Sequence, residues 1–287
     1  MQAAVVCGSS RGIGRAVAEA LGEKGWRVVL VARSRHDIEE VARGIRARGG
    51  SADVIEGDLG CNRTTRALAQ TLLSEHPRID LLVHVAGIWP AQRERNEDGL
   101  ERAFAVNHVA PFLLNHLLEE RLFASRGRVV QVSAGLYIKG RLDLAKTPKG
   151  DDFHALRTYP TTKLANVMLV PRFAERWGDR ASIVAVHPGV IRTALGDRGG
   201  LLGALLRLVK RTWKSPEEGA RPVVRLADAS VRSGTYFHEG EEQALLPIAT
   251  DPALVEALWN ATATFAGIRD AEDHEHGRGP RAQAIAR

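Results

Sequence analysis

Tyr159 and Lys163 are the residues of this sequence whose types and spacing most directly suggest chemistry. Side chains four residues apart lie on the same face of an α-helix, one turn from each other. A phenol titrates near pH ~10, and a neighbouring ammonium group favours its ionised form. The pair predicts a tyrosine that acts as a general acid or base, although on an ordinary helix the same spacing places a packed ring beside a solvated amine.

A second group of residues has the composition of a phosphate-binding loop. Gly8, Gly12 and Gly14 follow the apolar run of residues 3–7 and open an amphipathic stretch at residues 12–24. A strand, a glycine-rich turn and a helix N-terminus in this order let the backbone approach a pyrophosphate, whose charge the helix dipole favours. The pattern predicts a dinucleotide site made by Gly8, Ser10, Arg11, Gly12, Ile13 and Gly14.

Together the two groups resemble the short-chain dehydrogenase/reductase family, which joins a Gly-x-x-x-Gly-x-Gly loop to a downstream Tyr-x-x-x-Lys. Residues 107–114, residues 163–166 and His187-Pro188-Gly189 are most similar to its retinol-dehydrogenase-like branch. The similarity extends over roughly residues 3 to 266. It implies hydride transfer between a nicotinamide cofactor and a carbonyl/alcohol pair. Tyr159 would give the proton to the substrate oxygen, while Lys163 would lower the tyrosine pKa and hold the nicotinamide ribose.

The elements that position these residues follow from hydrophobic periodicity. Short apolar runs predict strands, and the amphipathic stretches between them predict helices. Strand and helix alternate over short connections, which favours an α/β fold with a single domain, a Rossmann-type doubly wound parallel sheet. The predicted strands are residues 3–7, 27–32, 51–56, 79–85, 127–133, 181–186 and 234–238, and the predicted helices are residues 12–24, 35–48, 62–74, 97–123 and 251–266, with further helices starting near Pro160 and at Ser215-Pro216.

The residues after the second predicted strand indicate which dinucleotide binds. NAD-specific sites usually carry an acidic residue there to hold the ribose 2′-hydroxyl, whereas this chain has Arg33-Ser34-Arg35. Arg33, with Ser34 beside it and Arg11 from the glycine loop, can form charge-assisted bonds with a 2′-phosphate. The pattern predicts NADP(H), unless these arginines are simply solvated surface residues.

The resemblance implies further contacts with the cofactor. They are Asp58 and Leu59 at the adenine, Ala86 and Gly87 where the cofactor passes the backbone, and Pro188, Gly189, Ile191 and Thr193 at the nicotinamide carboxamide and the pyrophosphate. Where the family usually reads Asn-Asn-Ala-Gly, this chain has His84-Val85-Ala86-Gly87. We expect His84 to be a buried core residue rather than a catalytic base, and we expect His187 to be structural as well.

Asn107 is the third residue to which the sequence gives a catalytic role. Pro111 lies four residues later in the helix predicted for residues 97–123, and a proline has no N–H to offer the carbonyl of Asn107. That carbonyl would then be free to bind a water. The resemblance implies that the matching asparagine anchors a water connecting the active-site lysine to solvent, and the alternative is a simple helix kink.

The end of the fifth predicted strand departs from the family pattern, which reads Val-Ser-Ser and uses the second serine to contact the substrate carbonyl. This chain has Val132-Ser133-Ala134. By register Ala134 takes the catalytic position, and Ser133 points to the other side of the strand. Either the hydroxyl is absent, which we favour, or a twist of the strand end presents Ser133 as the catalytic serine.

The substrate wall and the chain ends are the least defined parts of the prediction. Candidates for the wall are Trp89, Leu136 and Tyr137. A basic amphipathic helix at residues 201–211, within residues 194–215, is interpreted as a substrate lid, with a subunit contact or a membrane-surface patch as alternatives. The polar residues 269–287 predict a disordered tail after a dinucleotide-binding domain of residues 1–268.

Composition excludes several other classes of protein. The net charge of +6 comes from basic residues scattered among acidic ones, so we expect no nucleic-acid partner. The sequence contains no uninterrupted apolar run of ~18 residues, so we expect no membrane-spanning helix. No signal peptide is visible at the start. Two cysteines suit neither a disulfide framework nor a metal site, so we expect a cytoplasmic enzyme without a metal. The sequence leaves open whether it is a monomer or a homo-oligomer.

These observations predict an NADPH-dependent carbonyl reductase or alcohol dehydrogenase. Its small-molecule substrate is expected to be an apolar or polyketide-like metabolite, and the arginine-rich, alanine-rich composition suggests a GC-rich bacterial genome. Because Ala134 replaces the second serine of the family pattern, a redox-neutral epimerase, dehydratase or cyclase on the same scaffold stays open. A non-enzymatic NADPH-binding regulator is the third class, and the intact Tyr159 and Lys163 pair argues against it.

Overall fold

The computed structural model describes residues 1–192 and 213–268. The strands of this part are β1 (Ala3–Cys7), β2 (Arg27–Ala32), β3 (Ser51–Glu56), β4 (Leu81–His84), β5 (Arg128–Val132), β6 (Ser182–His187), β7 (Tyr236–His238) and β8 (Glu241–Gln243). The α-helices are α1 (Gly12–Glu23), α2 (Arg35–Ala47), α3 (Asn62–Glu75), α4 (Arg102–Phe104), α5 (Ala110–Leu117), α6 (Glu119–Ser125), α7 (Thr158–Trp177), α9 (Pro216–Asp228) and α10 (Pro252–Ala266).

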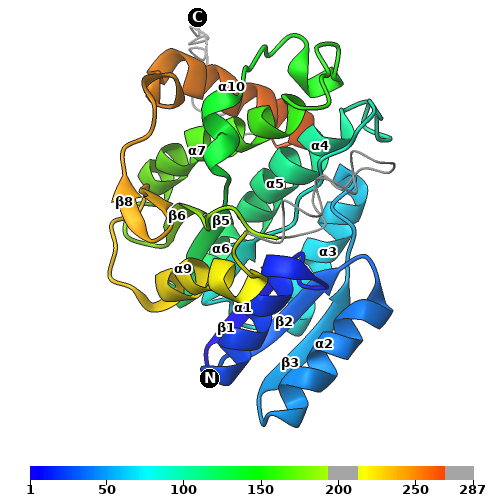
Figure 1. Ribbon diagram of the computed structural model, residues 1–287, viewed down its shortest axis with the longest axis vertical. Coiled ribbons are helices and arrows are strands. Elements are labelled where there is room, and N and C mark those ends of the chain that lie inside the picture. The colour runs from blue at the N-terminus through cyan, green and yellow to red at the C-terminus, as the bar shows by residue number, and fades with distance from the viewer. Residues whose placement is uncertain (193–212, 269–287) are drawn as a thin grey trace, which may run out of the picture.

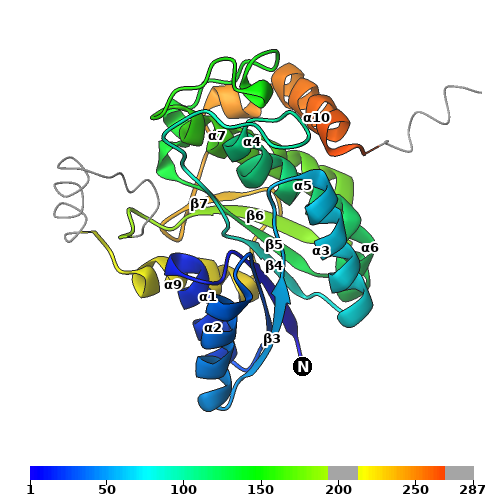
Figure 2. The same ribbon diagram turned by 90° about the vertical axis from the view of Figure 1, so that its right-hand side faces the viewer.

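The strands form one eight-stranded sheet in the order β3-β2-β1-β4-β5-β6-β7-β8 (Figure 1). Strands β1 to β7 are parallel, and β8 pairs antiparallel with β7. Figure 2 shows α1, α2 and α9 on one face of the sheet and α3, α5 and α7 on the other. The strand order reverses between β1 and β4, where open α/β sheets bind their ligands. The predicted doubly wound single-domain fold is confirmed.

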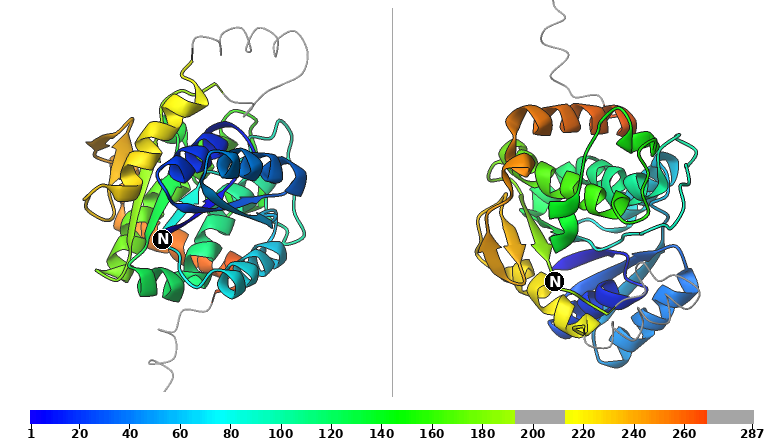
Figure 3. Two further views of the ribbon diagram at one scale, coloured as in Figure 1. Left: turned by 90° about the horizontal axis from the view of Figure 1, so that it is seen from below. Right: turned by 45° about the horizontal axis from the view of Figure 1, so that its top comes forward.

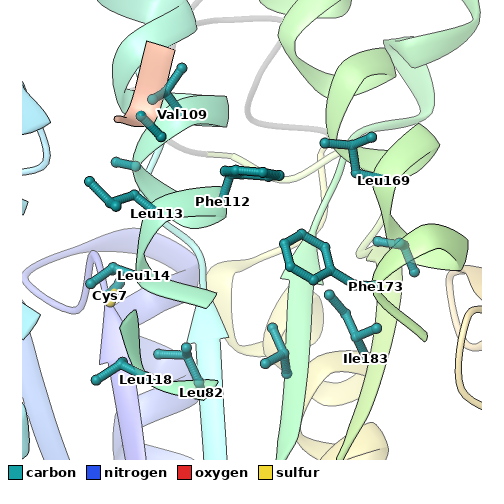
Figure 4. Close-up of a cluster of buried hydrophobic side chains, with 14 of the residues drawn as sticks. Cys7, Leu82, Val109, Phe112, Leu113, Leu114, Leu118, Leu169, Phe173 and Ile183 are labelled. Carbon is teal, nitrogen blue, oxygen red and sulfur yellow. The ribbon is translucent and has the colours of Figure 1, made fainter. Parts of the chain in front are cut away.

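Two apolar cores, one on each face, hold the helices to the sheet. Alternate strand residues point to opposite faces, so Val5 and Cys7 of β1 pack on one side while Ala4 and Val6 pack on the other. Such runs of consecutive buried apolar residues are typical of parallel strands covered on both faces. Figure 4 shows part of the core on the α5 and α7 side, where Leu82 and Ile183 of the sheet lie below Phe112, Leu113, Leu114, Leu169 and Phe173.

The single long helix predicted for residues 97–123 is wrong. Gly99 (φ +75°) closes a turn onto Asn96, and the carboxylate of Glu101 accepts a hydrogen bond from the Phe104 N–H at 2.8 Å, so helical structure begins at Arg102. A π-helical turn, η1 (Ala105–Val109), then separates α4 from α5. Because Pro111 has no N–H, a regular α-helical ladder would leave a carbonyl unpaired at this point, and the wider turn accommodates that loss.

Other sequence predictions agree with the structure to within a few residues. The helix predicted to start at Ser215-Pro216 is α9, and Ser215 and Glu218 form a reciprocal capping box at its start. Strand β8 was not predicted, since Glu241–Gln243 is short, polar and exposed. The predicted lid helix and the predicted tail lie outside the described residues. In the part of the chain that the structure describes, no helix combines the length and the apolar character needed to cross a bilayer.

Candidate active site

The glycine loop is packed so closely that side chains at two of its glycines would collide with backbone. Gly8 has φ +97°, and its N–H donates to the Val31 carbonyl at 2.8 Å. A Cβ on Gly8 would lie 2.7 Å from the Ala86 backbone, and a Cβ on Gly14 would lie 2.1 Å from the Gly8 carbonyl oxygen. Both positions therefore require glycine, and the loop leads into the N-terminus of α1, as in a dinucleotide site.

The two arginines predicted to select the cofactor have free guanidinium groups. Arg11 directly precedes α1, Arg33 follows β2, and both are exposed. Within residues 1–192 and 213–268, neither side chain has a hydrogen bond or an ion pair. Ser34 has a structural task, because its hydroxyl caps α2 by accepting from the Asp37 N–H at 3.3 Å. Two unpaired cations thus lie beside the predicted dinucleotide loop.

The remaining predicted cofactor contacts differ in exposure. Asp58 is exposed and accepts a hydrogen bond from the Gly60 N–H at 3.0 Å, which shapes the turn after β3, and Leu59 is buried beside it. Pro188 and Gly189 are buried at the end of β6, as is Ile191, which forms a parallel bridge with Lys214. Thr193 lies outside the described residues.

Tyr159 and Lys163 lie in the first two turns of α7, both almost fully buried. The Tyr159 ring stacks on the Trp89 indole with 4.6 Å between ring centroids and 10° between the ring planes. The Lys163 ammonium is 5.6 Å from the centre of the Tyr159 ring and donates a hydrogen bond to the Val132 carbonyl at 2.9 Å. The two side chains therefore meet on one face of the helix, as their spacing requires.

Burial controls the protonation of this pair. Desolvation raises the pKa of Tyr159 above its ordinary value of 10, and desolvation lowers the pKa of Lys163 from 10.5 to about 8. Desolvation sets the direction of the Tyr159 shift here, since the Lys163 ammonium is directed toward the Val132 carbonyl, and the expectation that Lys163 lowers the pKa of Tyr159 stays a prediction. A raised pKa keeps Tyr159 in the protonated form, the form that can donate a proton.

The side chain of Asn107 is held in the π-helical turn by three hydrogen bonds. Its Oδ1 accepts from the Ile88 N–H at 2.8 Å, and its Nδ2 donates to the Ile88 carbonyl at 2.9 Å and to the Thr162 hydroxyl at 3.0 Å. A Cβ on Gly87 would lie 3.5 Å from Asn107 Oδ1 and 3.8 Å from Lys163 Nζ. Asn107, Gly87 and Lys163 are therefore neighbours around one point at the edge of the sheet.

The prediction that the backbone carbonyl of Asn107 is free for a water needs correction. The carbonyl is not left for a water alone, because Asn166 Nδ2 donates to it at 2.7 Å. Asn166 Oδ1 in turn lies 2.8 Å from His108 Nδ1, and His108 Nε2 lies 3.0 Å from the Thr262 hydroxyl in α10. This buried polar chain fixes the π-helical turn against α7, since each member occupies a hydrogen-bonding group of the next.

Ser133 and Ala134 lie as the register of the strand indicates. Ser133 is buried, its N–H donates to the Val186 carbonyl at 2.8 Å, and its hydroxyl has no hydrogen-bond partner, Tyr159 included, among the described residues. Ala134 follows in extended conformation, half-buried, and precedes the 3-10 turn η2 (Gly135–Lys139). A methyl group thus stands where the family pattern places a hydroxyl.

The other side chains near the site divide into exposed and buried ones. Leu136 is 37% exposed and can form part of a substrate wall, together with the Trp89 indole. The third candidate for the wall, Tyr137, is buried, and its ring packs on Tyr236 with 5.4 Å between centroids. His84 is a core residue as expected: its Nε2 lies 2.9 Å from Asn115 Oδ1, and burial lowers its pKa to about 4.

Comparison with known proteins identifies the family. The sequence model of the short chain dehydrogenases matches residues 2–199. The chain belongs to the short-chain dehydrogenase family. Retinol dehydrogenase 14 of Mus musculus is 34% identical over 285 residues, which cover 92% of this chain and 85% of that protein. The protein named "Putative daunorubicin C-13 ketoreductase DnrU", of Streptomyces sp. (strain C5), is 34% identical over 269 residues and is covered, like this chain, to 92%. The predicted likeness to the retinol-dehydrogenase-like branch is confirmed.

Solved structures with the same fold include one in complex with NADP. A metagenomic short-chain oxidoreductase in complex with NADP matches with a TM-score of 0.61 and 27% identity, over 80% of this chain and 94% of that one. A protein from Mycobacterium Paratuberculosis shares the fold with a TM-score of 0.75 over 94% of each chain. Short-chain dehydrogenases bind NAD(P), and this member is an NAD(P)-dependent oxidoreductase, as predicted.

Two residues that position Asn107 in this short-chain dehydrogenase received no role in the sequence analysis. Thr162 and Asn166 both come from α7 and bind the side chain and the carbonyl of Asn107, respectively. A signal was present, because both are polar residues in a helix that is buried over its first thirteen positions. Polar groups buried in that setting need partners, although the sequence does not say which ones.

Proposed function

We propose that this short-chain dehydrogenase is an NADPH-dependent carbonyl reductase. The observation that carries the proposal is the convergence of Tyr159, Lys163 and Asn107 at the carboxyl edge of the sheet, next to a loop in which Gly8 and Gly14 leave no room for a side chain. Bound NADPH would supply the hydride. The chain's own residues then have to orient the substrate oxygen, deliver a proton to it and keep water away.

Tyr159 is the proton donor in this proposal. Its hydroxyl is protonated at neutral pH, as a phenol that titrates near pH ~10 would be even without the upward pKa shift that burial causes, so it can protonate the oxygen of a carbonyl being reduced. Lys163 would leave the Val132 carbonyl and hold the nicotinamide ribose, and its charge would then stabilise the tyrosinate that Tyr159 becomes after it gives up its proton. Asn107 fixes the backbone of Ile88 in the wall of the same site.

NADPH rather than NADH is proposed because Arg11 and Arg33 offer two unpaired guanidinium groups where a 2′-phosphate would lie. No acidic residue is present between Ala32 and Arg35 to hold a ribose 2′-hydroxyl. Losing one charge-assisted phosphate contact costs about 1.5–3 kcal/mol, which corresponds to a tenfold or larger change in affinity. The free side chains beside the loop support this assignment.

An apolar carbonyl compound, polyketide-like in character, is the proposed substrate class. The accessible parts of the site are the half-buried Trp89 indole and Ala134 methyl group and the exposed Leu136 side chain, none of which carries charge. The relatives support this class through their names, since one is a retinol dehydrogenase and another is named for a daunorubicin ketoreductase activity. We further propose that the enzyme serves bacterial secondary metabolism and is cytoplasmic.

A redox-neutral reaction is the second candidate, and Ala134 is the observation that favours it. Without a hydroxyl at this position, the site lacks one donor for charge that develops on the substrate oxygen. Removing one such donor from acyl-transfer enzymes slows them by about 10²–10³. An epimerase, dehydratase or cyclase that uses the cofactor only transiently would need this donor less.

Two measurements test the proposal. In the first, the protein is given NADPH and a panel of apolar and aromatic ketones, and both NADPH oxidation and alcohol formation are followed. Stoichiometric consumption supports the reductase, whereas product formation without net NADPH loss identifies the redox-neutral candidate.

In the second measurement, titration calorimetry compares NADPH with NADH for the unchanged protein, Arg33→Ala and the matched control Arg35→Ala. We expect NADPH to bind at least about tenfold tighter than NADH. Arg33→Ala should remove most of this preference, and Arg35→Ala should keep it because Arg35 is exposed and paired with Glu39. Equal affinities in the unchanged protein would contradict the cofactor assignment.

A further inference from the structure

Three side chains with metal-ligating atoms meet where β6 and β7 end. The parallel register pairs His187 with His238, and their ring centroids lie 4.8 Å apart. Glu239 follows His238, and its N–H donates to the His187 carbonyl at 2.8 Å. One ligand atom from each of the three residues lies within 4.8 Å of the other two. Within the described ranges, no second group of three or more such residues is so arranged.

The backbone at this corner directs the Glu239 carboxylate toward the two rings. Glu239 has φ +53°, a left-handed backbone conformation that residues other than glycine rarely adopt. Opposite it, Gly189 has φ +99°, and a Cβ there would lie 2.7 Å from Glu239 Oε1. The carboxylate therefore occupies space that only a glycine at position 189 leaves open.

His187 supplies an independent sign of a missing partner. Its Nδ1 is buried, the residue is only 7% exposed, and no described group forms a hydrogen bond with this nitrogen. The opposite edge of the ring packs on Gly135, since a Cβ there would lie 3.1 Å from Cδ2 and Nε2. Buried polar atoms in proteins are normally paired, so an orphaned ring nitrogen beside a second imidazole and a carboxylate points to an absent ligand.

We propose that His187, His238 and Glu239 bind a divalent cation of the zinc class. Two imidazoles and one carboxylate form a known ligand set of zinc sites that keep a fourth position open. With ligand bonds of about 2.0–2.2 Å, a tetrahedral ion holds its ligand atoms roughly 3.4 Å apart. His238 and Glu239 are exposed and can close that difference by changing side-chain rotamers.

Lys214 is the competing cation at this corner. Its ammonium pairs with Glu239 Oε2 in the structure, so a metal ion and Lys214 would share or exchange the same carboxylate. The site borders the candidate active site, because His187 opens the His187-Pro188-Gly189 segment and packs on Gly135, next to Ala134. A bound ion would therefore fasten the β7–β8 hairpin, at the edge of the sheet in Figure 3, to the end of β6.

The test is zinc titration calorimetry on full-length, untagged protein stripped with a chelator, together with Co²⁺ absorption spectroscopy. His274 and His276 can also attract zinc, so the measurement is made on the unchanged chain and on the double variant His274→Ala/His276→Ala. We expect one equivalent to bind in both, with the visible absorption of tetrahedral cobalt. Loss of binding in the double variant, or no stoichiometric binding in the unchanged chain, would overturn the proposal.

Single substitutions assign the ligands. Glu239→Gln and His238→Ala should each weaken zinc binding at least about tenfold, because even an outer partner of a metal ligand is worth 10–100-fold. Lys214→Met should tighten binding by several-fold, since it removes the competing ammonium. His36→Ala, at a side chain that is 85% exposed, should change nothing. Circular dichroism of the metal-free variants confirms that they are folded, and unchanged affinity in both Glu239→Gln and Lys214→Met would contradict the assignment.

Discussion

The glycine loop and the start of α7 form the two ends of the candidate active site, and they are constrained in different ways. In the loop, backbone atoms set the limits: a Cβ at Gly14 would lie 2.1 Å from the Gly8 carbonyl oxygen. At α7, side chains from distant segments set them, because Tyr159 stacks on Trp89 and Lys163 donates to Val132. The first constraint is local and rigid, whereas the second depends on partners that can move.

This difference also appears in the electrostatics. Arg11 beside the loop is exposed and retains its solvated charge, ready for a phosphate. Tyr159 and Lys163 are buried, and desolvation shifts both pKa values toward the neutral forms. The glycine loop therefore has a solvated cation beside it that can bind a phosphate. At the start of α7, the two pKa values depend on a low-dielectric environment that a bound cofactor would change. Substitutions at the two ends should separate binding from turnover.

The largest effect is expected from Tyr159→Phe. General acid catalysis contributes about 10²–10⁴ to a rate, so kcat/KM for ketone reduction should fall by about 10³ or more. The NADPH dissociation constant, measured by calorimetry, should stay within about twofold because the ring and its stacking on Trp89 remain. Tyr137→Phe, a buried ring with no predicted role in proton transfer, serves as the control. Activity within a few-fold of the unchanged enzyme would show that the proton comes from elsewhere.

Gly14→Ala should act on the other end of the site and on binding first. The new methyl group would displace the Gly8 carbonyl from its position in the loop, and NADPH affinity should fall by about 100-fold, which corresponds to about 2.7 kcal/mol. The matched control is Gly44→Ala in α2, where a Cβ would approach only Arg48 Nη1 at 3.7 Å. If Gly14→Ala binds NADPH nearly as well as the control does, the loop is less constrained than its geometry indicates.

Lys163→Met should stabilise the cofactor-free protein. The shift of the lysine pKa from 10.5 to about 8 corresponds to a cost of roughly 3 kcal/mol in the folding free energy of the unchanged protein. The variant avoids this cost but loses the hydrogen bond to the Val132 carbonyl, which reduces its gain in stability. The free energy of unfolding from urea titrations should therefore rise by about 1–2 kcal/mol at pH 7.

The sign of the pH dependence follows from the two protonation states. Below pH 8 the ammonium is charged in both the folded and the unfolded chain, and the full cost is present. Between about pH 8 and 10.5 the folded chain has already lost the proton, so the cost of the native lysine, and with it the gain from Lys163→Met, shrinks. Lys24→Met, at a half-exposed surface lysine, is the control. A stability gain that does not change up to pH 10.5 would contradict burial of a charged amine.

Ala134→Ser should have the smallest effect, and a positive one. If the site lacks an oxyanion donor, the new hydroxyl should raise the rate of simple ketone reduction by about tenfold, or ~1.4 kcal/mol of transition-state stabilisation. Ser133→Ala should change little, because the Ser133 hydroxyl is buried and forms no described hydrogen bond. A crippled Ser133→Ala enzyme would mean that the strand end rearranges to present Ser133.

Much of the fold could be predicted because its signals are short-range. The apolar run Ala3–Cys7 predicts a strand from its own residues, and the amphipathic stretch of α2 predicts a helix in the same way. The alternation of such strands and helices implies the parallel sheet. The prediction failed for the helix of residues 97–123, which was started at Glu97 although its first apolar residue, Leu100, follows Gly99. The capping contact of Glu101 and the π-helical turn decided that segment, and neither leaves a periodic trace.

The sequence by itself determined the chemistry available to this protein: the glycines of the loop, the Tyr159 and Lys163 pair on one helix face, and the absence of an acid after β2. These depend on residue type and near spacing. Only the tertiary structure decided that Trp89 covers Tyr159, that Asn166 rather than water alone occupies the Asn107 carbonyl, and that His187 faces His238. Each of these contacts joins segments far apart in the chain, and burial and strand register, which are properties of the packed molecule, select them.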